Sequence, residues 1–306
     1  MNCTLNLLSD RSERVPYNQV EMPIFVGIGN MAHFLNNAVP SHWHDDVEFC
    51  VILSGQMSYT INGTIHLLKV GEGAFVNSRQ FHNNFSVDKT ECSYLCVLFH
   101  PVLLCASKYL EETYVAPVIG NSAFPHVILL PDILWMAELL EEIKRIYSLC
   151  MTRKKDLYLS LQGIFYRIWS ILFMHMPTPT EQSERATTKL SMLREMTGFL
   201  HKHYQERITL ADVAAAANIC QSSCCIIFND YVHQTPIQYL IGYRLSKSVE
   251  LLKDTTMSIT DIALATGFAG TSYFSETFRK HFGLSPSTYR KREMKSSMTE
   301  KKHYTF

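Results

Sequence analysis

The sequence predicts an α+β multidomain protein, with a β-barrel in its N-terminal part and an all-α region of tandem helix-turn-helix units in its C-terminal part. Three observations support this. The 306 residues are enough for two domains. Short strand-like segments dominate the first part, whereas apolar residues at helical spacing dominate the rest. Finally, the helical part contains an internal repeat.

Strands are indicated over residues 20–118. Residues 59–61 and 65–68 flank Asn62-Gly63, a dipeptide that suits the type I′ turn of a β-hairpin. Gly71 and Gly73 mark the next turn, and residues 92–99 form another apolar run. Several short strands with regular turns are typical of a sandwich or barrel. We therefore assign residues 1–130 to one β domain.

Helical periodicity begins after Pro131. One helix is indicated around residues 136–150, and a second over 157–176. The second helix is apolar on most sides, which predicts burial either within the chain or against another chain. We predict that residues 131–176 form a dimerisation segment. The stretch 177–188 is rich in Pro, Thr, Ser and Glu and is predicted to be a linker, followed by a helical domain over 189–295 and a tail over 296–306.

The helical domain repeats itself at an offset of 49 residues, which becomes 50 after an interhelical turn. Thr209 and Ser258 each precede an aspartate by three residues, a pattern that caps a helix start. Asn218 and Gly267 occupy the matching turns, and both residue types tolerate a left-handed backbone. Each copy therefore predicts a helix-turn-helix unit, whose second helix enters the major groove of DNA. A plain helical bundle can use the same caps, but two copies in register favour DNA binding. The predicted units span 209–230 and 258–280.

Charge and cysteine content agree with this interpretation. Residues 1–188 carry a formal charge of −5 and residues 189–306 carry +5, which favours a polyanionic partner for the C-terminal part. The nine cysteines form no CxxC pair, and no signal peptide or 18-residue charge-free apolar run is present. We therefore expect reduced thiols, a cytoplasmic location and no membrane partner.

Residues 189–295 resemble the DNA-binding domain of the AraC/XylS family. The resemblance is carried mainly by the second unit and the helix before it, and the matching residues are Tyr239-Leu240, Arg244-Leu245, Ile259, Ile262-Ala263, Gly267-Phe268, Ser272-Tyr273-Phe274-Ser275, Phe278-Arg279-Lys280, Phe282-Gly283, Ser285-Pro286 and Tyr289-Arg290. It implies base reading by Thr271, Ser272, Ser275 and Glu276. It also implies that phosphates are contacted by Arg279, Lys280, Arg290, Lys291 and Arg292.

The first unit departs from the family pattern. Its base-facing positions correspond to Ser222, Cys225 and Ile226, and the family usually has arginine in place of Ile226. The recognition helix contains no cation, and Asp230 would repel phosphate. We therefore expect the second unit to supply more of the DNA affinity.

The barrel contains a candidate binding site. His42, His44 and Glu48 share the parity of one strand face, and His82 follows from another strand. Three imidazoles and a carboxylate suit Fe(II), Mn, Zn or Ni. Residues 20–100 resemble a cupin, although Asn77 and Arg79 replace the usual Pro and Gly of its second motif. Sensor barrels of AraC type imply that these four residues bind a small organic effector such as a sugar. A divalent metal at the same residues and a purely structural role are the alternatives, and no cofactor is required.

Together these features predict an effector-controlled transcription regulator that is not an enzyme. The expected partners are double-stranded DNA, a sugar or related metabolite, a second copy of the chain and, for an activator, RNA polymerase. One alternative is a constitutive regulator whose barrel only dimerises, and its DNA affinity would ignore metabolites. Another is a metal-dependent cupin enzyme fused to a DNA-binding domain, which would hold near-stoichiometric metal.

Overall fold

The computed structural model describes residues 12–19, 21–34, 37–86 and 91–292. The chain divides into two compact units, one of Met1–Arg194 with Asp230–His233 and one of Glu195–Asn229 with Gln234–Phe306. The predicted tail, 296–306, lies outside the described residues.

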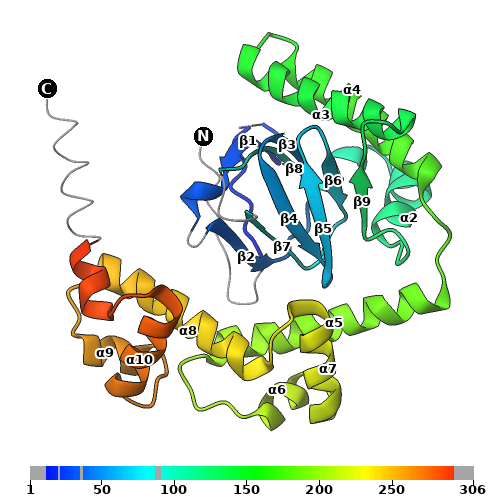
Figure 1. The fold of residues 1–306 in the computed structure, drawn as a ribbon. Coiled ribbons are helices and arrows are strands. Elements are labelled where there is room, and N and C mark those ends of the chain that lie inside the picture. Colours follow the sequence, from blue (N-terminus) through cyan, green and yellow to red (C-terminus); the bar gives the residue numbers. More distant parts are fainter. Residues whose placement is uncertain (1–11, 20, 35–36, 87–90, 293–306) are drawn as a thin grey trace, which may run out of the picture. The chain divides into compact units, whose positions relative to one another are not determined.

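Two antiparallel sheets form the N-terminal unit, as the sequence predicts (Figure 1). The five-stranded sheet has the order β1 (Ile24–Asn30), β8 (Ser93–Phe99), β3 (Val47–Ser54), β6 (Gly73–Val76) and β9 (His126–Leu129). The four-stranded sheet has the order β2 (Ala38–His42), β7 (His82–Ser86), β4 (Gln56–Ile61) and β5 (Thr64–Lys69). The predicted hairpin joins β4 to β5, and both Asn62 and Gly63 have positive φ, as a type I′ turn requires.

The unit has two apolar cores, one on each side of the five-stranded sheet. The first lies between the sheets and includes Cys50, Met57 and Tyr59. The second lies between the outer face of the five-stranded sheet and the helices α3 (Leu134–Thr152) and α4 (Leu157–His175). The Phe99 and Phe165 rings meet there at 4.4 Å between centroids.

Helix α4 is therefore buried within the chain along one side. By length and composition it is also the one helix among the described residues that would suffice to cross a membrane. Its opposite side leaves Leu159 79% exposed and Met174 74% exposed. The sequence left open whether this helix packs within the chain or against another chain, and the structure shows the first of these contacts.

The strand prediction is wrong over residues 101–118. The chain there forms short helical segments. A further short helix that was not predicted is the 3-10 helix η1 (Met31–His33). Pro101 occupies the first turn of a helix, and His100 and Ser107 accept hydrogen bonds from backbone N–H groups at two helix starts. These caps favour helical turns over strands despite the β-rich composition. The segments are η4 (Pro101–Leu104), α1 (Lys108–Leu110), the π-helix η5 (Glu111–Val115) and α2 (Ala116–Ile119).

The predicted linker is also largely helical. Helix α5 (Glu181–His203) begins within residues 177–188, so that only 177–180 precede it without regular structure. The Thr180 hydroxyl accepts a hydrogen bond from the Ser183 backbone N–H at 3.2 Å, which caps the helix start. A polar segment can be helical when it is solvent-exposed, which composition alone did not distinguish from a linker.

The helix-turn-helix repeat is confirmed. Helices α6 (Leu210–Ala216) and α7 (Gln221–Val232) form the first copy, and α9 (Ile259–Ala265) and α10 (Thr271–Phe282) form the second, with α8 (Pro236–Asp254) between the two. The Thr209 and Ser258 side chains cap α6 and α9 as predicted.

The two interhelical turns have the same backbone path. Asn218 has φ 53° and Gly267 has φ 80°, both left-handed. Ile219 N–H donates to Ala214 O at 3.1 Å, and Phe268 N–H donates to Ala263 O at 2.9 Å, so the same turn hydrogen bond occurs in both copies. The offset of 49 residues therefore holds in the backbone structure as well as in the sequence.

Candidate functional sites

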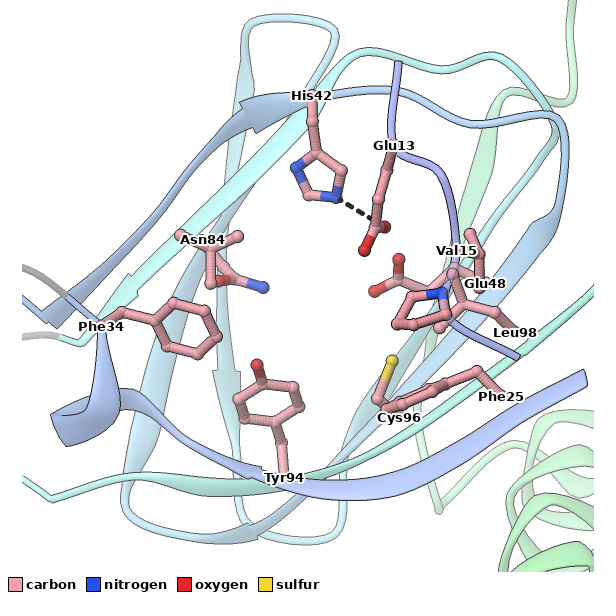
Figure 2. A pocket seen from close by; sticks show the side chains of 12 residues that line it. Glu13, Val15, Phe25, Phe34, His42, Glu48, Asn84, Tyr94, Cys96 and Leu98 are labelled. Carbon is pink, nitrogen blue, oxygen red and sulfur yellow. Dashed lines mark ion pairs between the residues drawn. The ribbon is translucent and has the colours of Figure 1, made fainter. Parts of the chain in front are cut away.

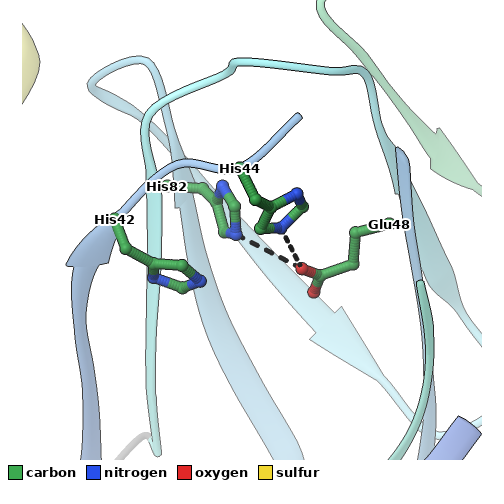
Figure 3. A group of neighbouring side chains, drawn as sticks. All are labelled: His42, His44, Glu48 and His82. Carbon is green, nitrogen blue, oxygen red and sulfur yellow. Dashed lines mark hydrogen bonds and ion pairs between the residues drawn. The ribbon is translucent and has the colours of Figure 1, made fainter. Parts of the chain in front are cut away.

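Four polar side chains converge inside the barrel: His42, His44, Glu48 and His82 (Figure 3). Their ligand atoms all lie within 4.8 Å of one another, and all four residues are buried. His42 ends β2, where an irregularity in the pairing after Val39 sets it opposite His82 of β7. His44 lies in the connection after β2 and Glu48 on β3.

The predicted reason for this convergence needs correction. Parity along a single strand does not place His42, His44 and Glu48 together, because β2 ends at His42 and the chain bends at Asp45 and Asp46 before β3. The residues meet because β2 and β3 belong to opposite sheets that face one another.

Glu48 connects the cluster. Its Oε2 accepts a hydrogen bond from His44 Nε2 at 3.1 Å and lies 3.3 Å from His82 Nε2. Its Oε1 accepts a hydrogen bond from the Tyr59 hydroxyl at 2.7 Å. Burial alone would raise the pKa of Glu48, but hydrogen bonds and charges from His44 and His82 hold that pKa well below its usual value. The carboxyl group is therefore ionised.

The histidines differ in protonation. Burial would lower the pKa of His44, but the hydrogen bond and the charge of Glu48 raise it to about 9. Burial and the neighbouring imidazoles His82 and His44 hold the pKa of His42 well below its usual value. Near neutral pH the site thus contains an ionised His44–Glu48 pair beside a neutral His42.

The outer nitrogen of each histidine is held by a backbone carbonyl. The Nδ1 atoms of His42, His44 and His82 donate to Pro40 O at 2.8 Å, Asp46 O at 3.0 Å and Gln80 O at 2.9 Å. This fixes the ring orientation and turns every Nε2 toward the centre, the arrangement typical of metal-binding histidines. His82 Nε2 is directed at the centre of the cluster, where it lies 3.3 Å from Glu48 Oε2. The four residues therefore fit a divalent metal ion.

A pocket opens beside the cluster (Figure 2). His42 and Glu48 line it together with Asn84, and its apolar walls include Phe25 and Phe34. Asn84 is buried, and its Oδ1 has no hydrogen-bond partner among the described residues. Asn84 was not among the predicted site residues, although it lies two residues after His82 and therefore on the same strand face.

Glu13 was also missed. Its Oε2 lies 3.7 Å from His42 Nε2, and its backbone N–H donates to Trp43 O at 2.7 Å. Burial raises the pKa of Glu13 to about 7; the charge of His44 lowers it, while the charges of Glu48 and Asp46 add to the rise. No local sequence signal marks this residue, because its contact with the barrel spans 29 positions of the chain.

The expected base-reading residues lie on the early turns of α7 and α10. Ser222, Ser272 and Glu276 are exposed, and Ile226 is 54% exposed. Cys225, Thr271 and Ser275 are half-buried, whereas Cys224, Ile227, Phe228, Phe274 and Phe278 form the buried faces of the two helices. Both helices thus present the predicted residues on the side opposite their core.

Most of the expected phosphate-contacting residues are exposed at the end of the second unit: Arg279, Lys280, Lys291 and Arg292. Arg290 differs, since it is half-buried and its Nε donates to Leu252 O at 3.3 Å. This bond gives Arg290 a structural role in anchoring the last helical turn to α8.

Comparisons with known proteins match both units. A helix-turn-helix domain model matches residues 213–292, and a cupin domain model matches residues 36–98. The HTH-type transcriptional regulator YdeC of Bacillus subtilis is 29% identical, over 91% of this chain and 95% of that protein. The melibiose operon regulatory protein of Escherichia coli K12 is 26% identical, over 82% of this chain and 83% of that protein. RhaR, an HTH-type transcriptional activator of Mannheimia succiniciproducens, is 26% identical over 84% of this chain and 88% of its own length.

Solved structures show a looser likeness. The structure of ToxT from Vibrio cholerae has a TM-score of 0.43 and 14% identity, covering 88% of this chain and 97% of that one. The DNA-binding domain of AdpA, solved with a target DNA, has a TM-score of 0.31 and 26% identity, covering 32% of this chain and 88% of that one.

A barrel followed by two capped helix-turn-helix units, with relatives that are transcription regulators over most of its length, defines a DNA-binding transcription regulator. The chain combines a cupin domain with a tandem helix-turn-helix domain, and over most of its length it is similar to HTH-type transcription regulators.

Proposed function

We propose that the barrel binds a small polar effector of the sugar class, and that its occupancy changes how the helix-turn-helix units bind DNA. The observation that carries this proposal is the buried Asn84 Oδ1, which borders the pocket without a hydrogen-bond partner among the described residues. A buried acceptor is costly without a donor, and an effector hydroxyl would supply one. One relative is named after the melibiose operon, which supports the sugar class.

The lining of the pocket suits such a ligand. Glu13, Glu48 and Asn84 offer acceptors for hydroxyl groups. Phe25 and Phe34 offer apolar surfaces on which the C–H faces of a sugar ring can pack. The pocket thus combines a few polar groups with apolar walls, as small-molecule sites generally do.

A divalent metal is a second candidate occupant, favoured by the three carbonyl-anchored histidines. His42, His44, Glu48 and His82 would hold it, and His44 would release its Nε2 proton. When bound, the metal would supply a Lewis-acid contact for an effector oxygen. The protein groups would still orient the ligand and exclude water from it.

The remaining parts of the proposal concern assembly and location. We place the homodimer contact on α3 and α4, where Leu159 and Met174 are exposed beside the buried face of α4. RNA polymerase is the further partner if the protein activates transcription. We place the protein in the cytoplasm, and we assign the barrel to regulation rather than catalysis because the relatives are transcription regulators.

The test measures binding of the full chain to DNA upstream of its own and neighbouring genes, at fixed salt, with and without candidate sugars. We expect specific binding whose affinity changes at least tenfold with one sugar, and loss of that response in Asn84→Ala. Exposed Ile65→Ala serves as the matched control and should respond like the wild type.

Two outcomes would contradict the proposal. In the first, DNA affinity changes neither with any ligand nor with the Asn84→Ala substitution. The protein would then be a constitutive regulator whose barrel only dimerises. Turnover of a bound compound together with near-stoichiometric metal would instead identify a cupin enzyme. A sugar response that is abolished by chelators and restored by one metal would support the metal-assisted form.

A further inference from the structure

A second pair of histidines lies at the opposite margin of the barrel. His66 belongs to β5 and His126 to β9, the last strands in the order of their two sheets. Their ring centroids are 4.8 Å apart, with the ring planes inclined at 60°. The pair therefore joins the two sheets where neither strand has a further described partner strand.

Strand register separates this pair from the effector pocket. His66 stands opposite Tyr59 in the β4–β5 pairing, and His126 stands opposite Val76 in the β6–β9 pairing. Val76 in turn stands opposite Glu48. His66 thus lies one strand beyond Tyr59, His126 lies two strands beyond Glu48, and neither histidine lines the pocket.

Both side chains point toward the space between the sheets. His66 shares strand parity with Leu68, and His126 shares it with Ile128, and both of these apolar residues pack in the inter-sheet core. His66 and His126 are only half-buried, so that solvent reaches part of each ring. Solvent therefore has partial access to the two imidazole rings.

One nitrogen of each ring is buried and lacks a hydrogen-bond partner. Within the described part of the chain, these atoms are His66 Nε2 and His126 Nδ1. A buried ring nitrogen is rarely left without a partner, so two adjacent imidazoles would normally share a hydrogen bond or bind a common third atom. These two nitrogens do not bond to each other, so both are available to a third atom.

We propose that His66 and His126 bind a divalent transition-metal ion that links β5 to β9. Imidazole nitrogens suit Zn²⁺, Ni²⁺ and Cu²⁺, and the partial exposure of both residues lets water complete the coordination shell. The ion connects two edge strands, β5 and β9, that do not pair with each other through backbone hydrogen bonds. This site is independent of the proposed effector function, because it shares no residue with the pocket.

The test uses the full chain, stripped of metal with a chelator and titrated with Zn²⁺ at pH 7.5 by calorimetry. We expect the wild type to bind one more equivalent of Zn²⁺ than the double variant His66→Gln/His126→Gln, in which the amides keep the polarity but bind Zn²⁺ poorly. Glu48→Gln, which alters the first cluster, should retain that equivalent. His33→Ala removes an exposed histidine of the same unit and should match the wild type.

Thermal unfolding gives a second readout. A hundredfold excess of Zn²⁺ over the dissociation constant should raise the unfolding midpoint of the wild-type N-terminal unit by roughly 5–10 °C more than that of the double variant. Circular dichroism without metal checks that both proteins fold. Equal Zn²⁺ equivalents and equal midpoint shifts in wild type and double variant would overturn the proposal and leave water as the occupant.

Discussion

At the scale of single residues, Cys220 shows how local hydrogen bonds change a side chain's chemistry. This exposed thiol precedes α7 and lies 3.2 Å from the hydroxyls of both Ser222 and Ser223. Hydrogen bonds with Ser222 and then Ser223 lower the pKa of Cys220 to about 7. Four residues later, burial raises the pKa of Cys224 to about 11. Of these two thiols, only the one at the start of the recognition helix is thiolate near neutral pH.

We predict that alkylation of Cys220 by iodoacetamide rises with pH, with a midpoint near 7, because the thiolate is the nucleophile and forms above the pKa. The change Ser222→Ala/Ser223→Ala should move the midpoint upward, toward the ordinary cysteine value of 9.0. Mass spectrometry of the peptide containing Cys220 measures both rates. An identical midpoint in both proteins would show that the hydroxyls do not stabilise the thiolate.

Residue patterns predicted the cluster in the barrel better than its surroundings. The spacing that predicted the cluster is that of His42, His44, Glu48 and His82. In the structure the ligand atoms of these residues lie within 4.8 Å of one another. Glu13 could not be predicted, since it reaches His42 only because the N-terminal segment pairs its backbone with Trp43. Its partner is fixed by tertiary structure and not by any short-range pattern.

At the scale of elements, the two interhelical turns differ in how they tolerate side chains. Gly267 has φ +80°, and a Cβ there would lie 2.4 Å from Tyr204 O. Asn218 adopts the matching left-handed conformation with a side chain already present. The second turn therefore needs glycine both for its backbone and for the close approach of the chain that follows α5, whereas the first needs only a residue that tolerates positive φ.

We predict that Gly267→Ala destabilises the C-terminal unit by at least ~2 kcal/mol, from left-handed strain and the clash with Tyr204 O. Asn218→Gly should change stability by less than ~1 kcal/mol, because glycine accepts the same conformation. Denaturant unfolding of the full chain measures both, with DNA affinity as the functional readout. Similar losses in both variants would mean that the two turns are equally demanding.

Prediction of elements succeeded where a capping pattern or a repeat was present. Thr209 and Ser258 correctly predicted two helix starts, and the 49-residue offset correctly predicted the two interhelical turns. It failed for residues 101–118 and for the start of α5, where composition outweighed the caps supplied by Ser107 and Thr180. A single hydroxyl at a helix start is thus more informative than the average composition of its segment.

At the scale of the whole molecule, the repeat is symmetric in backbone and asymmetric in charge. At an offset of 50 residues, Asn229 of α7 corresponds to Arg279 of α10, and both are exposed. The order of barrel, helical pair and DNA-binding unit could be predicted from changes in periodicity along the chain. The division of DNA affinity between the two units depends on these charges, and backbone symmetry does not determine it.

We predict that the second unit supplies most of the salt-dependent DNA affinity. In the full chain, Arg279→Ala/Lys280→Ala should reduce the slope of log affinity against log salt by up to ~2, because each lost phosphate contact removes ~0.9. Asn229→Lys should increase the slope by ~1 by giving the first unit the contact that α10 already has. Lys108→Ala, an exposed cation of the N-terminal unit, controls for net charge and should leave the slope unchanged. If the Arg279/Lys280 variant kept the wild-type slope while Asn229→Lys raised it, phosphate binding would have to arise outside α10, and the charge asymmetry would not explain the division of affinity.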